Sequence, residues 1–208
     1  MRPPRLLLIL ALATAPLASV SASAPAVATE QVAPVTAADR SIGRADAPVT
    51  VIEYASFACH LCADWHQLVY PTFKTRFIDT GRVRYVFRNL PTPPEEMSLP
   101  AAALARCAAP GKFFDVAASL MHGQAAVLRG GDRDDWYAPA IAVSGRTRAQ
   151  IDACAATPAT RAAINRDIDS AIAADIDSTP SFFVNGRRVT DRSLGGLEVA
   201  IRAAASGR

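Results

Sequence analysis

Three stretches of the chain have the short, apolar character of β-strands. Residues 48–54 are rich in β-branched and apolar residues, and residues 82–88 place arginines between apolar residues. Residues 178–184 return to a strand-like composition after a long interval. Runs of this kind predict strands that are buried or half-buried in a sheet.

The residues between the first two predicted strands have apolar positions at helical spacing. They predict a helix from Cys62 to about Phe77, which Pro71 kinks or tightens by one turn and which Gly81 ends. A strand, a helix and a second strand in this order predict two parallel strands in one sheet, joined by a right-handed crossover.

The C-terminal part of the chain predicts a hairpin and a final helix. Asn185-Gly186 is the strongest short signal for a hairpin turn, because both residues tolerate a positive φ. Residues 187–189 are therefore predicted to pair back antiparallel onto 178–184. Residues 193–205 are predicted to form the closing helix.

Residues 95–175, which follow a proline-rich break, are rich in alanine and have a helical pattern. They predict an all-helical subdomain inserted between the two halves of the sheet, with helices at about 97–108, 112–124, 133–144, 147–156 and 158–175. The predicted fold class is therefore α/β. We expect one domain over residues 48–205, preceded by a loosely held arm at 29–47.

Residues 1–28 have the three-part layout of a secretory signal peptide. Two arginines precede an apolar run from Leu6 to Leu17, and small residues follow up to Ala28. Cleavage is expected after Ala28, with a site after Ala24 as the second candidate. The apolar run is shorter than the roughly 20 residues that span a bilayer, so an uncleaved anchor is the weaker alternative.

Charge argues against two classes of partner. After removal of residues 1–28 the chain keeps 20 basic and 19 acidic residues, a net charge of +1. A nearly neutral protein is not expected to bind nucleic acid or an anionic membrane surface as its main partner.

The four cysteines, Cys59, Cys62, Cys107 and Cys154, allow three pairings. An exported protein lies where disulfides persist, and the spacing favours 59–62 together with 107–154. We expect Cys107 and Cys154 to form a structural disulfide within the helical subdomain. The alternatives are two buried free cysteines, or one cysteine that relays electrons to Cys59.

Cys59 and Cys62 form a Cys-x-x-Cys motif that opens a helix after a strand. The first cysteine would lie at the positive helix N-terminus, where the thiolate is favoured and can act as the nucleophile. The second would be more enclosed and would resolve a mixed disulfide. A purely structural bridge and a metal site with His66 are alternatives, but the metal site lacks a clear fourth ligand. We expect His66 to be a solvated helix residue.

Glu53 is an acid within a predicted buried strand, where a carboxylate is costly unless it is paired or functional. We hypothesise that it moves protons to and from Cys62 through water. The alternative is a glutamate at the edge of the strand, in contact with solvent.

Two segments, Glu53-Tyr-Ala-Ser-Phe-Ala-Cys-His-Leu-Cys62 and Thr179-Pro-Ser-Phe-Phe-Val-Asn-Gly186, resemble the DsbA-type periplasmic disulfide oxidoreductases. The resemblance extends over about 48–203 and implies a thioredoxin fold. It implies that Pro180 is a cis-proline facing the active-site sulfurs and that the Thr179 backbone helps to dock an extended substrate. It also implies that Glu53 lies beneath the resolving cysteine.

The resemblance implies a thiol–disulfide oxidoreductase that needs no cofactor beyond its cysteine pair. The chain departs from the best-known members at the dipeptide between the cysteines, which is His60-Leu61 instead of Pro-His. We expect a periplasmic monomer that donates disulfides to unfolded or reduced exported proteins and that a membrane or soluble redox partner resets. A reductase or isomerase, or a non-catalytic module that binds clients, are the alternatives.

Overall fold

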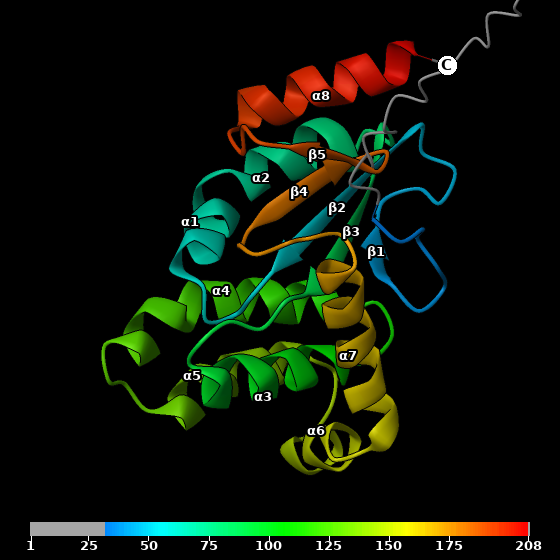
Figure 1. Cartoon of the computed structure of the whole chain (residues 1–208). Coiled ribbons are helices and arrows are strands. Elements are labelled where there is room, and N and C mark those ends of the chain that lie inside the picture. Colours follow the sequence, from blue (N-terminus) through cyan, green and yellow to red (C-terminus); the bar gives the residue numbers. More distant parts are fainter. Residues whose placement is uncertain (1–31, 208) are drawn as a thin grey trace, which may run out of the picture.

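The computed structural model describes residues 32–207, which form a mixed sheet covered by helices (Figure 1). Within these residues the sheet has five strands in the order β1-β3-β2-β4-β5. The strands are β1 (Arg40–Ile42), β2 (Val49–Ala55), β3 (Val83–Asn89), β4 (Ser181–Val184) and β5 (Arg187–Val189). The predicted signal peptide lies outside the described residues.

The predicted strand–helix–strand unit forms the centre of the sheet. β2 and β3 pair in parallel, with Glu53 opposite Phe87. β4 pairs antiparallel with the other side of β2 and turns back into β5. The turn lies at Asn185 and Gly186, whose φ angles are 46° and 82°. The parallel crossover and the hairpin are both confirmed.

The helices of the crossover cover one face of the sheet together with the C-terminal helix. They are α1 (His60–Leu68), α2 (Tyr70–Phe73), a π-helical turn (Lys74–Ile78) and α8 (Leu194–Ser206). Pro71 lies in the first turn of α2. The expected break in the helix that follows Cys62 therefore occurs at Val69, between α1 and α2. Trp65 and Phe73 pack there with Phe182 of β4 and Leu197 of α8.

β3 is buried on both faces, which its pattern of arginines between apolar residues does not predict. Arg88 is only 3% exposed. Its guanidinium donates to the Asp39 carboxylate and to the Tyr54 hydroxyl, each at 2.8 Å. The charge is thus compensated where the neighbouring elements cover the strand.

The predicted arm at 29–47 is not loosely held over the part that the structure describes. β1 pairs antiparallel with β3, with Arg40 opposite Phe87 and Ile42 opposite Tyr85. Arg40 also donates to the Arg106 carbonyl at 2.8 Å. The prediction was wrong for this part because a small and polar composition does not reveal pairing through the backbone.

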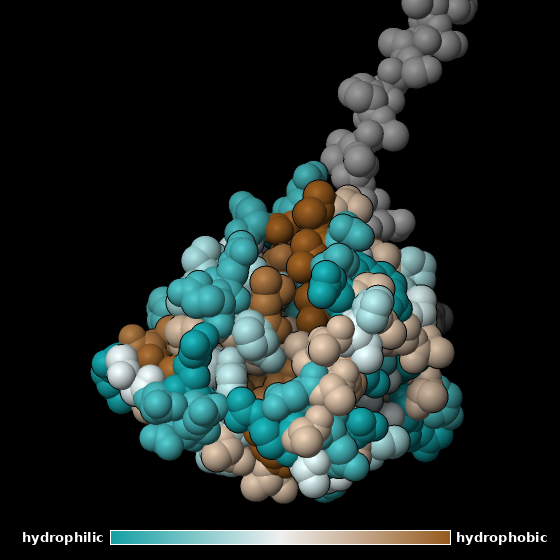
Figure 2. Space-filling view, turned by 90° about the horizontal axis from the view of Figure 1, so that it is seen from below, coloured by the Kyte–Doolittle hydropathy of each residue, from teal (hydrophilic) through white to brown (hydrophobic). Residues whose placement is uncertain are grey.

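The helical subdomain lies between β3 and β4 in the chain and below the sheet in Figure 1. Its helices are α3 (Glu95–Arg106), α4 (Phe113–Leu128), α5 (Arg133–Val143), α6 (Arg148–Ala155) and α7 (Pro158–Ile172). No helix in the described residues is both long and apolar enough to cross a membrane. Seen from below, hydrophobic residues gather in a hollow between hydrophilic ones (Figure 2).

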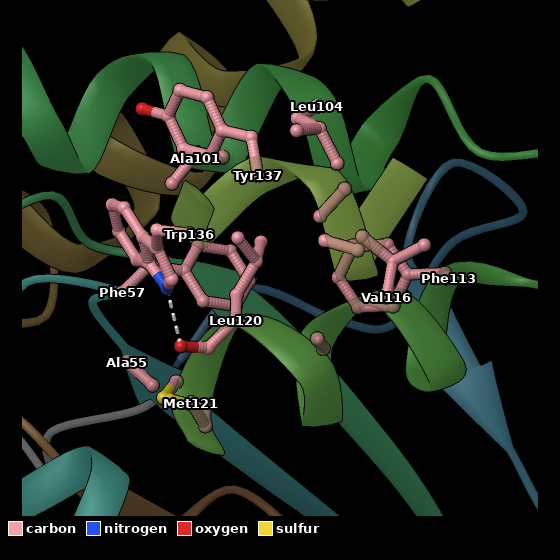
Figure 3. Packing of buried hydrophobic residues seen from close by; sticks show 14 of the residues in the cluster. Ala55, Phe57, Ala101, Leu104, Phe113, Val116, Leu120, Met121, Trp136 and Tyr137 are labelled. Carbon is pink, nitrogen blue, oxygen red and sulfur yellow. Dashed lines mark hydrogen bonds between the residues drawn. The ribbon is translucent and has the colours of Figure 1, made fainter. Parts of the chain in front are cut away.

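The core of the helical subdomain is continuous with the end of the sheet. Ala55 and Phe57, which end and follow β2, belong to the same buried cluster as Leu120 and Met121 of α4 (Figure 3). In this cluster the Trp136 indole donates to the Leu120 carbonyl at 2.8 Å. The subdomain therefore packs directly against the segment that leads to Cys59.

A disulfide joins Cys107, which follows α3, to Cys154 in α6, with a Cα–Cα distance of 5.8 Å. The bridge lies within the helical subdomain, and Cys107 is buried. Since its cysteines are 47 residues apart in sequence, the bridge constrains much of the unfolded subdomain.

We predict that the double variant Cys107→Ser/Cys154→Ser unfolds more easily but still exchanges disulfides. The chain-entropy relation gives a loss of up to about 4 kcal/mol in the free energy of unfolding for a loop of this length. Denaturant titration of the oxidised wild type and the variant measures this loss, and a thiol-exchange assay measures the activity. An unchanged unfolding midpoint would contradict the stabilising role, and loss of exchange in a folded variant would favour the electron relay.

Candidate active site

Cys59 caps the N-terminus of α1, at the end of the short loop that follows β2. Its side chain accepts a hydrogen bond from the Cys62 backbone N–H at 3.4 Å. The first turn of α1 contains no acidic residue. The Cys59 sulfur therefore faces the positive end of the helix, where a negative charge is favoured.

The two thiols of the motif have pKa values that move in opposite directions. Hydrogen bonds from the Cys62 thiol, from the Thr179 side chain and from the backbone N–H groups of Cys62 and Leu61 lower the pKa of Cys59 to about 6, although partial burial opposes them. Cys62 is completely buried, and burial raises its pKa well above the ordinary value. At neutral pH, Cys59 is thus a thiolate and Cys62 a thiol.

The loop before β4 meets the cysteine pair, although it lies 120 residues further along the chain. The Thr179–Pro180 peptide is cis, and the Thr179 carbonyl lies 3.3 Å from Cys59 Sγ. The Arg192 guanidinium donates to the Pro180 carbonyl at 3.2 Å, and the Arg192 carbonyl accepts from the Trp65 indole at 3.0 Å. Arg192, which sequence reasoning missed, thus connects this loop to α1.

Gln124 of α4 holds the loop that carries Cys59. Its side chain is buried, and its amide donates to the Phe57 carbonyl at 2.6 Å and to the Cys59 carbonyl at 3.0 Å. Sequence reasoning also missed this residue. The available signal was a single amide among the small and apolar residues 116–127, since a buried amide needs hydrogen-bond partners.

Glu53 and His66 form a buried pair next to the cysteines. Glu53 is completely buried in β2, and its Oε2 lies 3.0 Å from His66 Nε2 of α1. The Tyr85 hydroxyl donates to the same carboxylate oxygen. Glu53 Oε1 is buried with no hydrogen-bond partner, so part of the carboxylate stays unsatisfied.

These contacts correct one expectation, for His66, and exclude one alternative, for Glu53. His66 is not a solvated helix residue, since its side chain is 3% exposed and faces Glu53. Glu53 does not lie at a solvated strand edge, because β2 has neighbours on both sides. The spacing contains the missed signal: His66 follows Cys62 by four residues, which places both on one face of α1.

The two residues between the cysteines are exposed to solvent, and Leu61 exposes 45% of its surface. His60-Leu61 therefore forms part of the surface around Cys59. Among residues 32–207, no three His, Cys, Asp or Glu side chains are grouped so that they could hold a metal ion.

Comparisons with known proteins place the chain in a family. A thioredoxin family model matches residues 36–203. A probable disulfide bond formation protein D from Bacillus cereus is 41% identical over 64 residues, which are 31% of this chain and 30% of that protein. A Na(+)/H(+) antiporter NhaA 3 from Salinispora tropica is 33% identical over 159 residues, which are 72% of this chain. The match covers only 22% of the antiporter, so the chain spans less than a third of either relative.

A solved structure shares the arrangement of sheet and inserted helices. The alpha-DsbA1 of Wolbachia pipientis superposes with a TM-score of 0.73 at 24% sequence identity, over 84% of this chain and 94% of that one. The family model covers most of the described residues, including the cysteine motif and the cis-proline loop. The chain therefore belongs to the thioredoxin family, and its fold is the DsbA-like form with a helical insertion.

Proposed function

We propose that the chain is an exported thiol–disulfide oxidoreductase that donates disulfides to folding client proteins. The observation that carries this proposal is the contrast between the two thiols. Cys59 is partly exposed at a helix N-terminus with a pKa of about 6, and Cys62 is buried with a raised pKa. A low-pKa thiol is a good leaving group, and its stabilisation favours the reduced enzyme and so makes the disulfide form an oxidant.

The exchange proceeds in two steps. A client thiolate attacks Cys59 Sγ of the oxidised pair, the Cys59–Cys62 bond breaks, and Cys62 leaves and takes up a proton. A second client thiolate then attacks the client sulfur of the mixed disulfide and releases the Cys59 thiolate. The client leaves oxidised by two electrons and the enzyme is reduced by the same two, which a redox partner must remove. No cofactor takes part.

Thr179 and Pro180 are the proposed docking residues for the client. Pro180 has no backbone N–H, and the Thr179 backbone lies beside the Cys59 sulfur. An extended client segment would pair with this backbone as an added strand and present its cysteine to Cys59. Exposed Leu61 offers an apolar contact next to the reacting sulfur.

Export, oligomeric state and the direction of exchange complete the proposal. Residues 1–28 support export to the periplasm, and the near-neutral charge supports protein clients over nucleic acid. We propose that the chain works as a monomer. Net reduction or isomerisation is the second candidate, since exchange at Cys59 runs in either direction. Equilibration with a glutathione buffer decides between them. A cysteine pair that is a strong oxidant of glutathione supports disulfide donation.

We predict that Cys62→Ser traps a client as a mixed disulfide at Cys59. Without the second thiol, the bond between the client and Cys59 has no resolving partner in the enzyme. Incubation with a disulfide-containing peptide, followed by non-reducing mass spectrometry, measures the adduct. The matched variant Cys59→Ser is expected to form none. Trapping in Cys59→Ser alone would reverse the two roles, and trapping in neither would argue for an inert client-binding module.

We predict that Cys59 titrates near pH 6 in the reduced protein and that this pKa depends on Cys62 as a hydrogen-bond donor. Cys62→Ala removes the donor and should raise the pKa of Cys59, whereas Cys62→Ser keeps a hydroxyl donor and should raise it less. The rate of alkylation by iodoacetamide as a function of pH reports the thiolate. Equal pKa values in all three proteins would contradict the assigned cause.

The lowered pKa has a consequence for stability with a definite sign. The thiolate stabilises the folded, reduced protein fully above the unfolded thiol pKa of about 8.5. This contribution is lost as the pH falls through about 6. The free energy of unfolding of the reduced wild type should therefore decrease relative to that of Cys59→Ala as the pH falls through this window. A difference between the two proteins that does not change with pH would contradict the prediction.

We predict that Glu53→Gln changes the pH dependence of disulfide exchange and slows the step in which Cys62 leaves and takes up a proton. The proposed role of Glu53 is to move protons to and from Cys62, with His66 holding its carboxylate. General acid–base groups contribute about 100-fold at the low end, which is the expected size of the loss. Stopped-flow exchange across pH measures it, with exposed Glu96→Gln as the control. An unchanged pH profile in a folded Glu53→Gln protein would exclude the role.

A further inference from the structure

A cavity lies away from the cysteine motif, where β1, the end of α3 and the loop before α6 meet. It has a volume of about 500 Å³, and three arginines from these three segments, Arg40, Arg106 and Arg146, line it. Phe113 and Phe114 contribute apolar walls. The volume lies within the range of roughly 300–1,000 Å³ that is usual for small-molecule sites.

The positive charge of this cavity is not balanced from within it. Arg106 forms an ion pair with Asp167, which does not line the cavity. Between positions 32 and 207, neither Arg40 nor Arg146 forms an ion pair with an acid. Burial and the charge of Arg106 lower the pKa of Arg40, and the charge of Asp167 opposes this shift only in part.

The acid in the cavity wall is already engaged, and two of the cavity arginines are closely packed. Asp39 accepts from Arg88 at 2.8 and 3.3 Å, so its carboxylate is directed to a cation outside the cavity. Arg106 is 6% exposed, and its Nε is buried with no hydrogen-bond partner, as is the Nε of Arg40. The Arg40 guanidinium lies 5.8 Å from the centre of the Phe113 ring. Both Nε atoms are enclosed by the protein, so a ligand in the cavity would meet the terminal nitrogens of these guanidinium groups.

We propose that this cavity binds an organic carboxylate. The carboxylate would lie among Arg40, Arg106 and Arg146, where planar guanidinium groups can donate two parallel hydrogen bonds to it. The apolar part of the ligand would lie against Phe113 and Phe114. Such a group is carried by a free acid with an apolar body or by the C-terminus of a peptide. The site uses neither Cys59 nor Cys62, so it stands or falls independently of the proposed redox function.

The test is calorimetric titration of the purified protein with four probes. These are N-acetyl-phenylalanine, its uncharged amide, an N-acetylated tetrapeptide that ends in phenylalanine with a free carboxylate, and inorganic phosphate. We expect both acids to bind, the amide to bind at least about tenfold more weakly, and affinity to fall with added salt. The higher affinity of N-acetyl-phenylalanine or of the tetrapeptide would identify which source of carboxylate the cavity prefers.

Two arginines close in sequence provide a matched pair of variants. Arg146→Gln removes a cavity cation, and it should weaken binding of the acids at least about tenfold. Arg148→Gln removes a cation that pairs with Asp134 and Asp152 and does not line the cavity, so it should leave binding unchanged. Failure of both acids to bind, equal binding of acid and amide, or equal affinity in Arg146→Gln would each overturn the proposal. Equally tight binding of inorganic phosphate would overturn the role of the apolar walls.

Discussion

The first turn of α1 is the feature on which the chemistry of the cysteine pair depends. The Cys62 backbone N–H in this turn donates to the Cys59 sulfur, and the same helix places the Cys62 side chain in the core. One helical turn thus separates a site that favours a negative charge from one that opposes it. In the proposed exchange, this difference determines which sulfur reacts with clients and which closes the ring.

Buried polar contacts fix the position of that turn. Gln124 of the helical subdomain donates to two carbonyls of the loop before α1, while the Thr179 carbonyl approaches the sulfur from the far half of the sheet. Each of these contacts joins segments that are distant in sequence. The inserted helices are therefore part of the active-site architecture, because the loop carrying Cys59 would lose its amide donors without α4.

The sequence predicted the features that have a local signal. The strand that contains Glu53, the Asn185-Gly186 turn and the helical insertion each follow from composition and spacing within one segment. The burial of His66 does not, because its surroundings come from β2 and from aromatic residues of other elements. The prediction of a loosely held arm failed over residues 32–47 for the same reason, since β1 is stabilised by its partner strand and by the Asp39–Arg88 ion pair. Arg192 and Gln124 act through backbone carbonyls of remote loops, which no motif records.

The exposed dipeptide His60-Leu61 contributes to Cys59 mainly through its backbone. The groups that lower the pKa of Cys59 are the Cys62 thiol, the Thr179 side chain and the N–H groups of residues 61 and 62. None of these depends on the identity of the side chains at positions 60 and 61. A departure from the Pro-His dipeptide therefore leaves the main source of thiolate stabilisation in place. It changes the surface beside the reacting sulfur, where Leu61 presents an apolar side chain in place of an imidazole.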